Sequence, residues 1–180
     1  DVNTPVILMG YTNPIERMGY EKFIERMVVS GVDGVLTVDL PPEEAEVFNE
    51  QLRASNIENI FLLAPTSSQI RQKKVTNMAG GFVYYVSLNG VTGAANLDVD
   101  SVKDHVSSIR ALTKLPICVG FGIKDGVTAR AVADVSDGVV VGSAIVNKIA
   151  DLAKLGELDP LIYAETVSVI IKDIRDALDK

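Results

Sequence analysis

Short apolar runs recur along the chain, and a segment with helical periodicity follows each of them. Runs of this length, rich in Val, Ile, Leu, Phe and Tyr, predict strands, and their alternation with helices is typical of consecutive β/α units around a parallel sheet. Their apolar residues are continuous rather than alternating, which indicates strands covered on both faces. The predicted strands are residues 6–11, 34–39, 59–63, 81–87, 116–120 and 137–141.

Apolar stripes between the strands predict amphipathic helices. Pro41-Pro42, Thr66-Ser67 and Asp159-Pro160 are typical of helix starts, and Glu43 and Glu44 are expected to stabilise a helix N-terminus. The stripes are Met18, Phe23 and Met27; Ala45, Phe48 and Leu52; Val102, Val106, Ile109 and Leu112; and Val167, Ile170, Ile171, Ile174 and Leu178.

The number of units predicts the fold class. A closed (β/α)8 TIM barrel has eight units and takes about 250 residues, whereas this chain of 180 residues supplies roughly six. We therefore predict an α/β protein with an incomplete TIM barrel, folded as one domain over residues 1–180. The first strand begins a few residues into the chain, so the missing units are expected to precede it.

Charge and composition exclude several classes of partner. A net charge of -7 leaves no surplus of Lys and Arg for a nucleic acid or an anionic membrane, so partners are expected to be small molecules or proteins. The single cysteine, Cys118, lies in an apolar run and is interpreted as an inert core residue. No secretory signal and no apolar stretch of about 20 residues is seen, which favours a cytoplasmic location.

Glycines end the last two predicted strands. Gly120-Phe121-Gly122 follows one, and Gly142-Ser143 follows the other and begins a helix. In (β/α)8 barrels a common phosphate site lies in these loops, where backbone N–H groups and a helix N-terminus meet the anion. A phosphate site is favoured over two ordinary turns. A third glycine-rich stretch, residues 87–95, is predicted to be a binding loop or lid rather than a plain surface loop, with Gly93 reaching the same phosphate.

Polar side chains at other strand ends give no catalytic pair. Tyr11, Asp39 and Tyr84 are expected to face a ligand, but Asp39 is the one carboxylate among them, and acid/base catalysis usually needs two positioned groups. His105 lies among polar residues and is interpreted as solvent-exposed. No residue cluster predicts a metal site or a cofactor.

The motifs together resemble the tryptophan synthase α chain family, and the likeness extends over essentially the whole chain. Order and spacing both fit, and the combination is highly specific. The matching segments are Met9-Gly10-Tyr11-Thr12-Asn13-Pro14, Val38-Asp39-Leu40-Pro41, Tyr84-Tyr85-Val86-Ser87, Gly90-Val91-Thr92-Gly93-Ala94, Gly120-Phe121-Gly122-Ile123 and Gly142-Ser143-Ala144-Ile145-Val146.

This resemblance implies a lyase that cleaves indole-3-glycerol phosphate to indole and glyceraldehyde 3-phosphate in tryptophan biosynthesis. It also implies a β-chain partner, which is itself pyridoxal-phosphate dependent, and no cofactor in this chain. The implied roles are phosphate binding by Gly93, Gly122, Gly142 and Ser143; an indole pocket of Phe121, Tyr11, Leu36 and Met9; supporting positions for Thr92 and Tyr84; and a β-chain interface at Asn13, Pro41 and Gly90.

The chain departs from the family in one respect. The family's catalytic glutamate and aspartate lie in an early segment similar to Glu-Leu-Gly-Ile-Pro-Phe-Ser-Asp-Pro, which does not occur in this sequence. The six units are then the third to eighth of the barrel, and the chain alone is expected to bind but not to catalyse. Two alternatives remain: a non-catalytic module that binds glycerol phosphate or a β chain, and another phosphate-binding barrel enzyme such as an isomerase.

Overall fold

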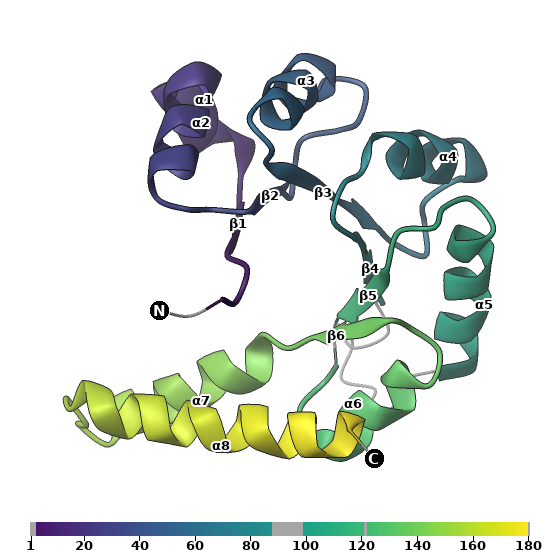
Figure 1. The fold of residues 1–180 in the computed structure, drawn as a ribbon. Coiled ribbons are helices and arrows are strands. Elements are labelled where there is room, and N and C mark those ends of the chain that lie inside the picture. The colour runs from purple at the N-terminus through teal and green to yellow at the C-terminus, as the bar shows by residue number, and fades with distance from the viewer. Residues whose placement is uncertain (1–2, 88–98, 121, 180) are drawn as a thin grey trace. The chain divides into compact units, whose positions relative to one another are not determined.

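The computed structural model describes residues 3–87, 99–120 and 122–179. One or two helices follow each strand along these residues (Figure 1), and all six predicted strands are confirmed to within two residues at each end. The elements are β1 (Ile7–Gly10), α1 (Thr12–Met18), α2 (Tyr20–Val29), β2 (Gly34–Thr37), α3 (Glu46–Ala54), β3 (Glu58–Leu63), α4 (Gln69–Met78), β4 (Val83–Val86), α5 (Val99–Arg110), β5 (Ile117–Gly120), α6 (Gly126–Ala133), β6 (Gly138–Val140), α7 (Ser143–Lys154) and α8 (Pro160–Leu178).

The chain forms two compact units. The first comprises Asp1–Tyr84 and Ile109–Pro116, and the second comprises Tyr85–Ser108 and Ile117–Lys180. In the first unit β1 pairs with β2, and β2 with β3, all in parallel. In the second unit β5 and β6 are parallel neighbours. Because parallel strands end at the same edge of a sheet, the loops after them gather there.

Helix α3 carries the core of the first unit. Ala45, Phe48 and Leu52 are fully buried, which confirms their predicted stripe, and the ring of Phe48 stacks on that of Tyr20 at 4.6 Å. Figure 1 shows α2, α3 and α4 on the same side of β1, β2 and β3. Burial of these side chains holds the helices against one face of the sheet.

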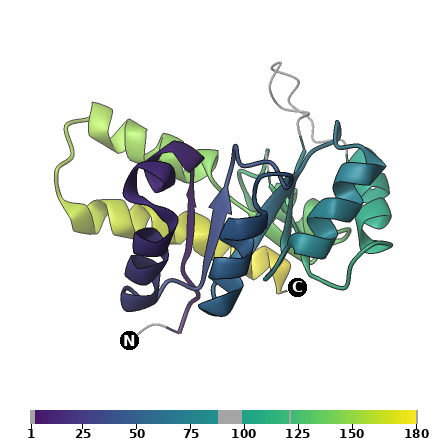
Figure 2. The same cartoon turned by 90° about the horizontal axis from the view of Figure 1, so that it is seen from above.

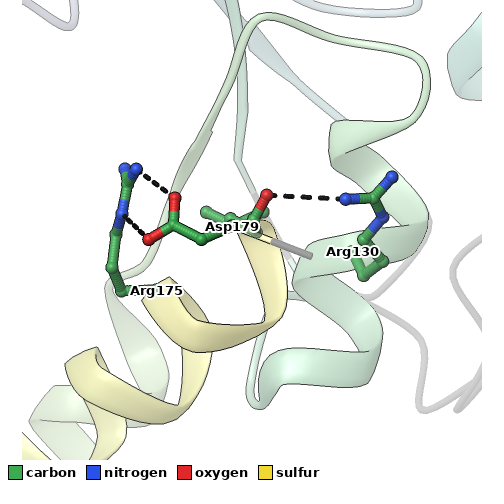
Figure 3. A network of polar contacts seen from close by, with 4 residues as sticks. Arg130, Arg175 and Asp179 are labelled. Carbon is green, nitrogen blue, oxygen red and sulfur yellow. Dashed lines mark hydrogen bonds and ion pairs between the residues drawn. The ribbon is translucent and has the colours of Figure 1, made fainter.

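The second unit is held together by contacts among its helices. Figure 2 shows α7 and α8 running side by side. The backbone N–H of Gly126, the first residue of α6, donates to Oδ2 of Asp173 on α8 at 2.8 Å. At the end of α8, Arg175 is paired with Asp179, and Nη1 of Arg130 on α6 reaches the carbonyl oxygen of Leu178 at 3.4 Å (Figure 3). These contacts fix the last helix on α6.

Two helix predictions need correction. The stripe through Met18 and Met27 is not one helix, because Gly19 has a φ of 87° and separates α1 from α2. Helix α3 begins at Glu46 rather than after Pro41-Pro42, so Glu43 caps no helix and instead forms an ion pair with Lys74 at 3.5 Å.

Strand β1 also departs from prediction, since it is not covered on both faces. It pairs with β2 and stands first in the order of the first unit's sheet. Being a terminal strand of that sheet, it leaves apolar side chains exposed: Ile7 by 39%, Leu8 by 38% and Met9 by 60%, and Val6 just before it by 50%. None of the helices in the described ranges has the length and apolar composition needed to span a membrane.

Candidate functional site

The two glycine sites follow neighbouring strands of the second unit. Gly120 and Val140 are register partners in β5 and β6, so the strands end side by side, about 4.8 Å apart. Gly122 and Gly142 each stand two residues beyond these partners. The fold therefore brings both glycines to the carboxyl edge of one sheet, as the sequence predicts.

Gly142 is the N-cap of α7, a helix of 12 residues. Its carbonyl oxygen accepts from the N–H groups of Ile145 and Val146, at 3.0 and 3.1 Å. Among the described residues, no hydrogen bond uses the N–H groups of Ser143 and Ala144 or the Ser143 hydroxyl, and no side chain caps the helix. Such a helix end offers free donors and a partial positive charge to an anion.

Gly122 and Gly142 differ in how strictly the backbone requires glycine. Gly122 has a φ of 80°, in the left-handed region that L side chains rarely adopt. Gly142 has a φ of -126°, and a Cβ built on it meets nothing within 4 Å. The space beside Gly142 is open, and a side chain there is sterically tolerated. Both residues are exposed, so their backbones are accessible.

Several predicted site residues lie outside the described residues: Gly90, Thr92, Gly93 and Phe121. Their roles in phosphate binding, the indole pocket and the partner interface stay predictions. Ser87, the last described residue before that stretch, donates its N–H to the carbonyl oxygen of Gly120 at 3.1 Å. The end of β4 is thereby tied to the end of β5 within the second unit.

Met9 and Leu36 share one face of the first unit's sheet. They are register partners in β1 and β2, and Leu36 in turn pairs with Ile60 in β3. The neighbouring residue Asn59 points the other way, because its amide donates to Oδ1 of Asn49 on α3 at 3.1 Å. Side chains alternate along a strand, so Met9 and Leu36 face away from α3. Leu36 is buried, whereas Met9 is exposed.

Tyr84 faces away from the helix packed on its own strand. Its neighbour Tyr85 is buried and stacks on His105 of α5, with 5.6 Å between ring centroids. Alternation therefore turns the half-buried Tyr84 to the opposite face. Among the remaining predicted residues, Tyr11 is 63% exposed at the end of β1, Asn13 is exposed on α1, and Pro41 is half-buried after β2.

Asp39 is held by a residue that sequence reasoning missed. Oδ1 of Asp39 accepts from the backbone N–H of Thr12 at 2.7 Å and from its hydroxyl at 2.8 Å. These two hydrogen bonds lower the pKa of the Asp39 carboxyl. Thr12 is the first residue of α1. The sequence signal that could have identified it is a hydroxyl residue at the start of a helix. Asp39 is an ionised anchor between the ends of β1 and β2.

Two residues set aside on sequence grounds have defined environments. The solvent-exposed interpretation of His105 is wrong, because its ring is half-buried on Tyr85 and Nδ1 lies 2.7 Å from the carbonyl oxygen of Ser101. Cys118 is half-buried, and burial, with a contribution from Asp137, raises the pKa of its thiol. A protonated thiol agrees with the inert interpretation. No cluster of three or more potential metal ligands occurs within residues 3–87, 99–120 and 122–179.

A family model, curated relatives and solved structures agree on one family. The family model described as tryptophan synthase alpha chain matches residues 1–169. A tryptophan synthase alpha chain from Thioalkalivibrio sulfidiphilus is 53% identical over 99% of this chain and 66% of its own length. One from Paraburkholderia phytofirmans is 53% identical over 98% of this chain and 63% of its own. The chain thus spans just under two thirds of the length of these relatives.

Solved structures with the same fold come from the same family. The tryptophan synthase alpha subunit from Legionella pneumophila has a TM-score of 0.87 at 39% identity, over 99% of this chain and 64% of that chain. A chain of the tryptophan synthase complex from Pyrococcus furiosus has a TM-score of 0.82 at 31% identity, over 97% of this chain and 67% of that chain. The predicted fold class is thereby confirmed.

Proposed function

We propose, since this chain belongs to the tryptophan synthase alpha chain family, that it serves in the cleavage of indole-3-glycerol phosphate to indole and glyceraldehyde 3-phosphate. The observation that carries this proposal is the pairing of Gly122 and Gly142 at the ends of two neighbouring strands. Both stand two residues past register partners, and one of them opens a helix whose first N–H groups have no partner among the described residues.

In this proposal the second unit holds the phosphate. The N–H groups of Ser143 and Ala144 and the hydroxyl of Ser143 donate to phosphate oxygens, and the N-terminal end of α7 favours the negative charge. Gly122 supports the same anion through its backbone, and Gly93 joins it from the loop after β4. No metal is needed for this kind of binding, because the donors are backbone groups already directed at the anion.

The apolar part of the substrate is assigned to a different set of residues. We propose that Met9, Leu36 and Tyr11, all in the first unit, contact the indole ring. The same role is proposed separately for Phe121, which lies outside the described residues. Met9 and Leu36 share the sheet face opposite α3, which supports their assignment. Tyr84 and Thr92 are proposed to lie beside the reacting glycerol side chain.

A protein partner and a cellular location complete the proposal. Pyrococcus furiosus has a solved tryptophan synthase complex, and a chain of that complex shares this fold. We propose that Asn13, Pro41 and Gly90 contact a tryptophan synthase β chain, which carries pyridoxal phosphate, and that the assembly works in the cytoplasm. Asn13 is exposed on α1, as an interface residue must be in the unbound chain.

A charge placed at Gly142 tests the phosphate assignment. Gly142→Asp puts a carboxylate where the phosphate is proposed to bind, and like-charge contact costs several kcal/mol. Titration calorimetry with glycerol 3-phosphate should show at least about a thirtyfold loss of affinity. Asp is also a favourable N-cap, so the free protein should unfold at the same or a slightly higher temperature.

The neutral isostere Gly142→Asn is the control. It has nearly the same size and capping ability without the charge, so its affinity for glycerol 3-phosphate should fall much less. Equal affinities for the Asp and Asn variants would place the phosphate elsewhere. Measuring indole release in the same samples separates turnover from binding alone.

A further inference from the structure

Helices α2 and α3 of the first unit border a groove of about 460 Å³. Its apolar lining comes from Ile24, Val28 and Val29 on α2 and from Ala54 on α3. Its polar lining comes from Glu21, Glu25, Gln51 and Ser55. None of these residues belongs to the proposed phosphate site, the proposed indole pocket or the proposed β-chain interface.

Part of the apolar lining of this groove is exposed. Val28 is 53% exposed and Val29 is 84% exposed, in adjacent positions at the end of α2. Ile24, by contrast, is buried. Adjacent exposed aliphatic side chains over a hollow indicate a surface that gains free energy when an apolar group covers it.

Two carboxylates lie beside the groove and have no partner among the described residues of the first unit. Glu21 and Glu25 are exposed and four residues apart on α2, a spacing at which like charges weaken a helix. Among the described residues, neither forms an ion pair or a hydrogen bond, whereas Glu43 does pair with a lysine. Two unpaired anions beside an exposed aliphatic pair favour a cationic, amphipathic occupant.

A third acceptor lines the same groove. Oε1 of Gln51 is shielded from water and has no hydrogen-bond partner. An unsatisfied polar atom of this kind is costly. The terminal amide rotates about χ3, a soft torsion, so Oε1 can turn to a donor that enters the groove.

We propose that this groove docks a basic amphipathic helix of a partner protein. Aliphatic side chains of that helix cover Val28 and Val29, and Lys or Arg side chains one helical turn apart meet Glu21 and Glu25. An N–H donor from the same helix satisfies Gln51. A helix fits because its i and i+4 positions repeat about every 6 Å, the spacing of the two carboxylates on α2.

The probe for this proposal is a fluorescein-labelled, alanine-rich peptide of about 15 residues, long enough to form a helix. Leucines every three or four residues form one face, and arginines flank it. Its binding to the 180-residue chain is measured by fluorescence anisotropy at low salt. Matched peptides carry glutamate for arginine or serine for leucine, and neither should bind. Equal binding of the glutamate peptide would overturn the proposal.

Variants of the chain locate the binding. Glu21→Gln with Glu25→Gln should weaken binding of the arginine peptide about fivefold, the effect of two exposed ion pairs. The control is Glu46→Gln with Glu50→Gln, an exposed pair at the same spacing on α3 outside the groove, and it should leave affinity unchanged. Val28→Ser should weaken binding as well. Equal loss in the groove and control variants, or no loss in either, would overturn the proposal. Added glycerol 3-phosphate should not compete, so this result is independent of the phosphate site.

Discussion

The hydrogen bonds from Thr12 to Asp39 make a single residue pair sensitive to pH. They lower the pKa of Asp39 below its usual value of 3.8, first through the backbone N–H and then through the hydroxyl. A carboxyl whose pKa is lowered by folding stabilises the folded state above its unfolded-state pKa. That stabilisation is lost as the pH falls through the lowered, folded-state value.

Thr12→Val should therefore raise the pKa of Asp39 toward its usual value, because only the backbone donor remains. The measurement is the titration of the Asp39 carboxyl carbon by NMR. The difference in melting temperature between the variant and the parent should shrink once the pH falls below the folded-state pKa. Thr12→Ser keeps the hydroxyl and should leave the titration unchanged; a shift of similar size in both variants would contradict the assignment.

Individual residues also show which features of the site can be predicted from sequence alone. Gly122 and Gly142 were predictable as a pair because both follow apolar runs that form adjacent strands. Their different backbone environments were not, since a φ of 80° at Gly122 and open space at Gly142 depend on the folded backbone. The stacking of His105 on Tyr85 was hidden for the same reason, because polar neighbours in sequence do not reveal which face a helix buries.

Among the elements, the packing of α6 against α8 depends on a glycine at their contact. A Cβ built on Gly126 would lie 2.9 Å from Cβ of Ala177 and 3.0 Å from the carbonyl oxygen of Asp173. Gly126→Ala should thus force the two helices apart and strain the N–H bond from Gly126 to Asp173. We expect a loss of about 1 to 3 kcal/mol in the free energy of unfolding, measured with urea.

The same substitution at Gly142 is the matched control. No atom lies within 4 Å of a Cβ built there, so Gly142→Ala should change the free energy of unfolding by less than about 0.5 kcal/mol. Adding Ala177→Gly to Gly126→Ala removes one of the two clashes and should restore part of the stability. Similar losses for Gly126→Ala and Gly142→Ala would show that the close contact is not the cause.

At the level of elements, periodicity predicted strands better than helix boundaries. Six apolar runs gave six strands, and Ala45, Phe48 and Leu52 gave the buried stripe of α3. The break at Gly19 was missed because the apolar spacing continues across it, while the backbone conformation does not. The exposure of β1 was missed because an apolar run has the same appearance whether or not its strand is covered.

For the whole molecule, exposed apolar surface and net charge act in opposite directions. Ile7, Leu8 and Met9 of β1, with Val6 just before it, form an exposed apolar segment, a feature that promotes pairing between chains. A net charge of -7 opposes association through repulsion. Salt screens that repulsion but leaves the apolar contact in place. Self-association of the 180-residue chain should therefore increase with protein concentration and with added salt.

Ile7→Lys separates the two effects. It interrupts the apolar strand but makes the net charge less negative, so a mechanism based on repulsion predicts more association and one based on the strand predicts less. We expect less, measured by sedimentation velocity over a range of concentrations. Val127→Lys, which adds the same charge at an exposed valine on α6, should not reduce association. If both lysine variants associate more than the parent chain, charge rather than strand exposure governs the behaviour of the molecule in solution.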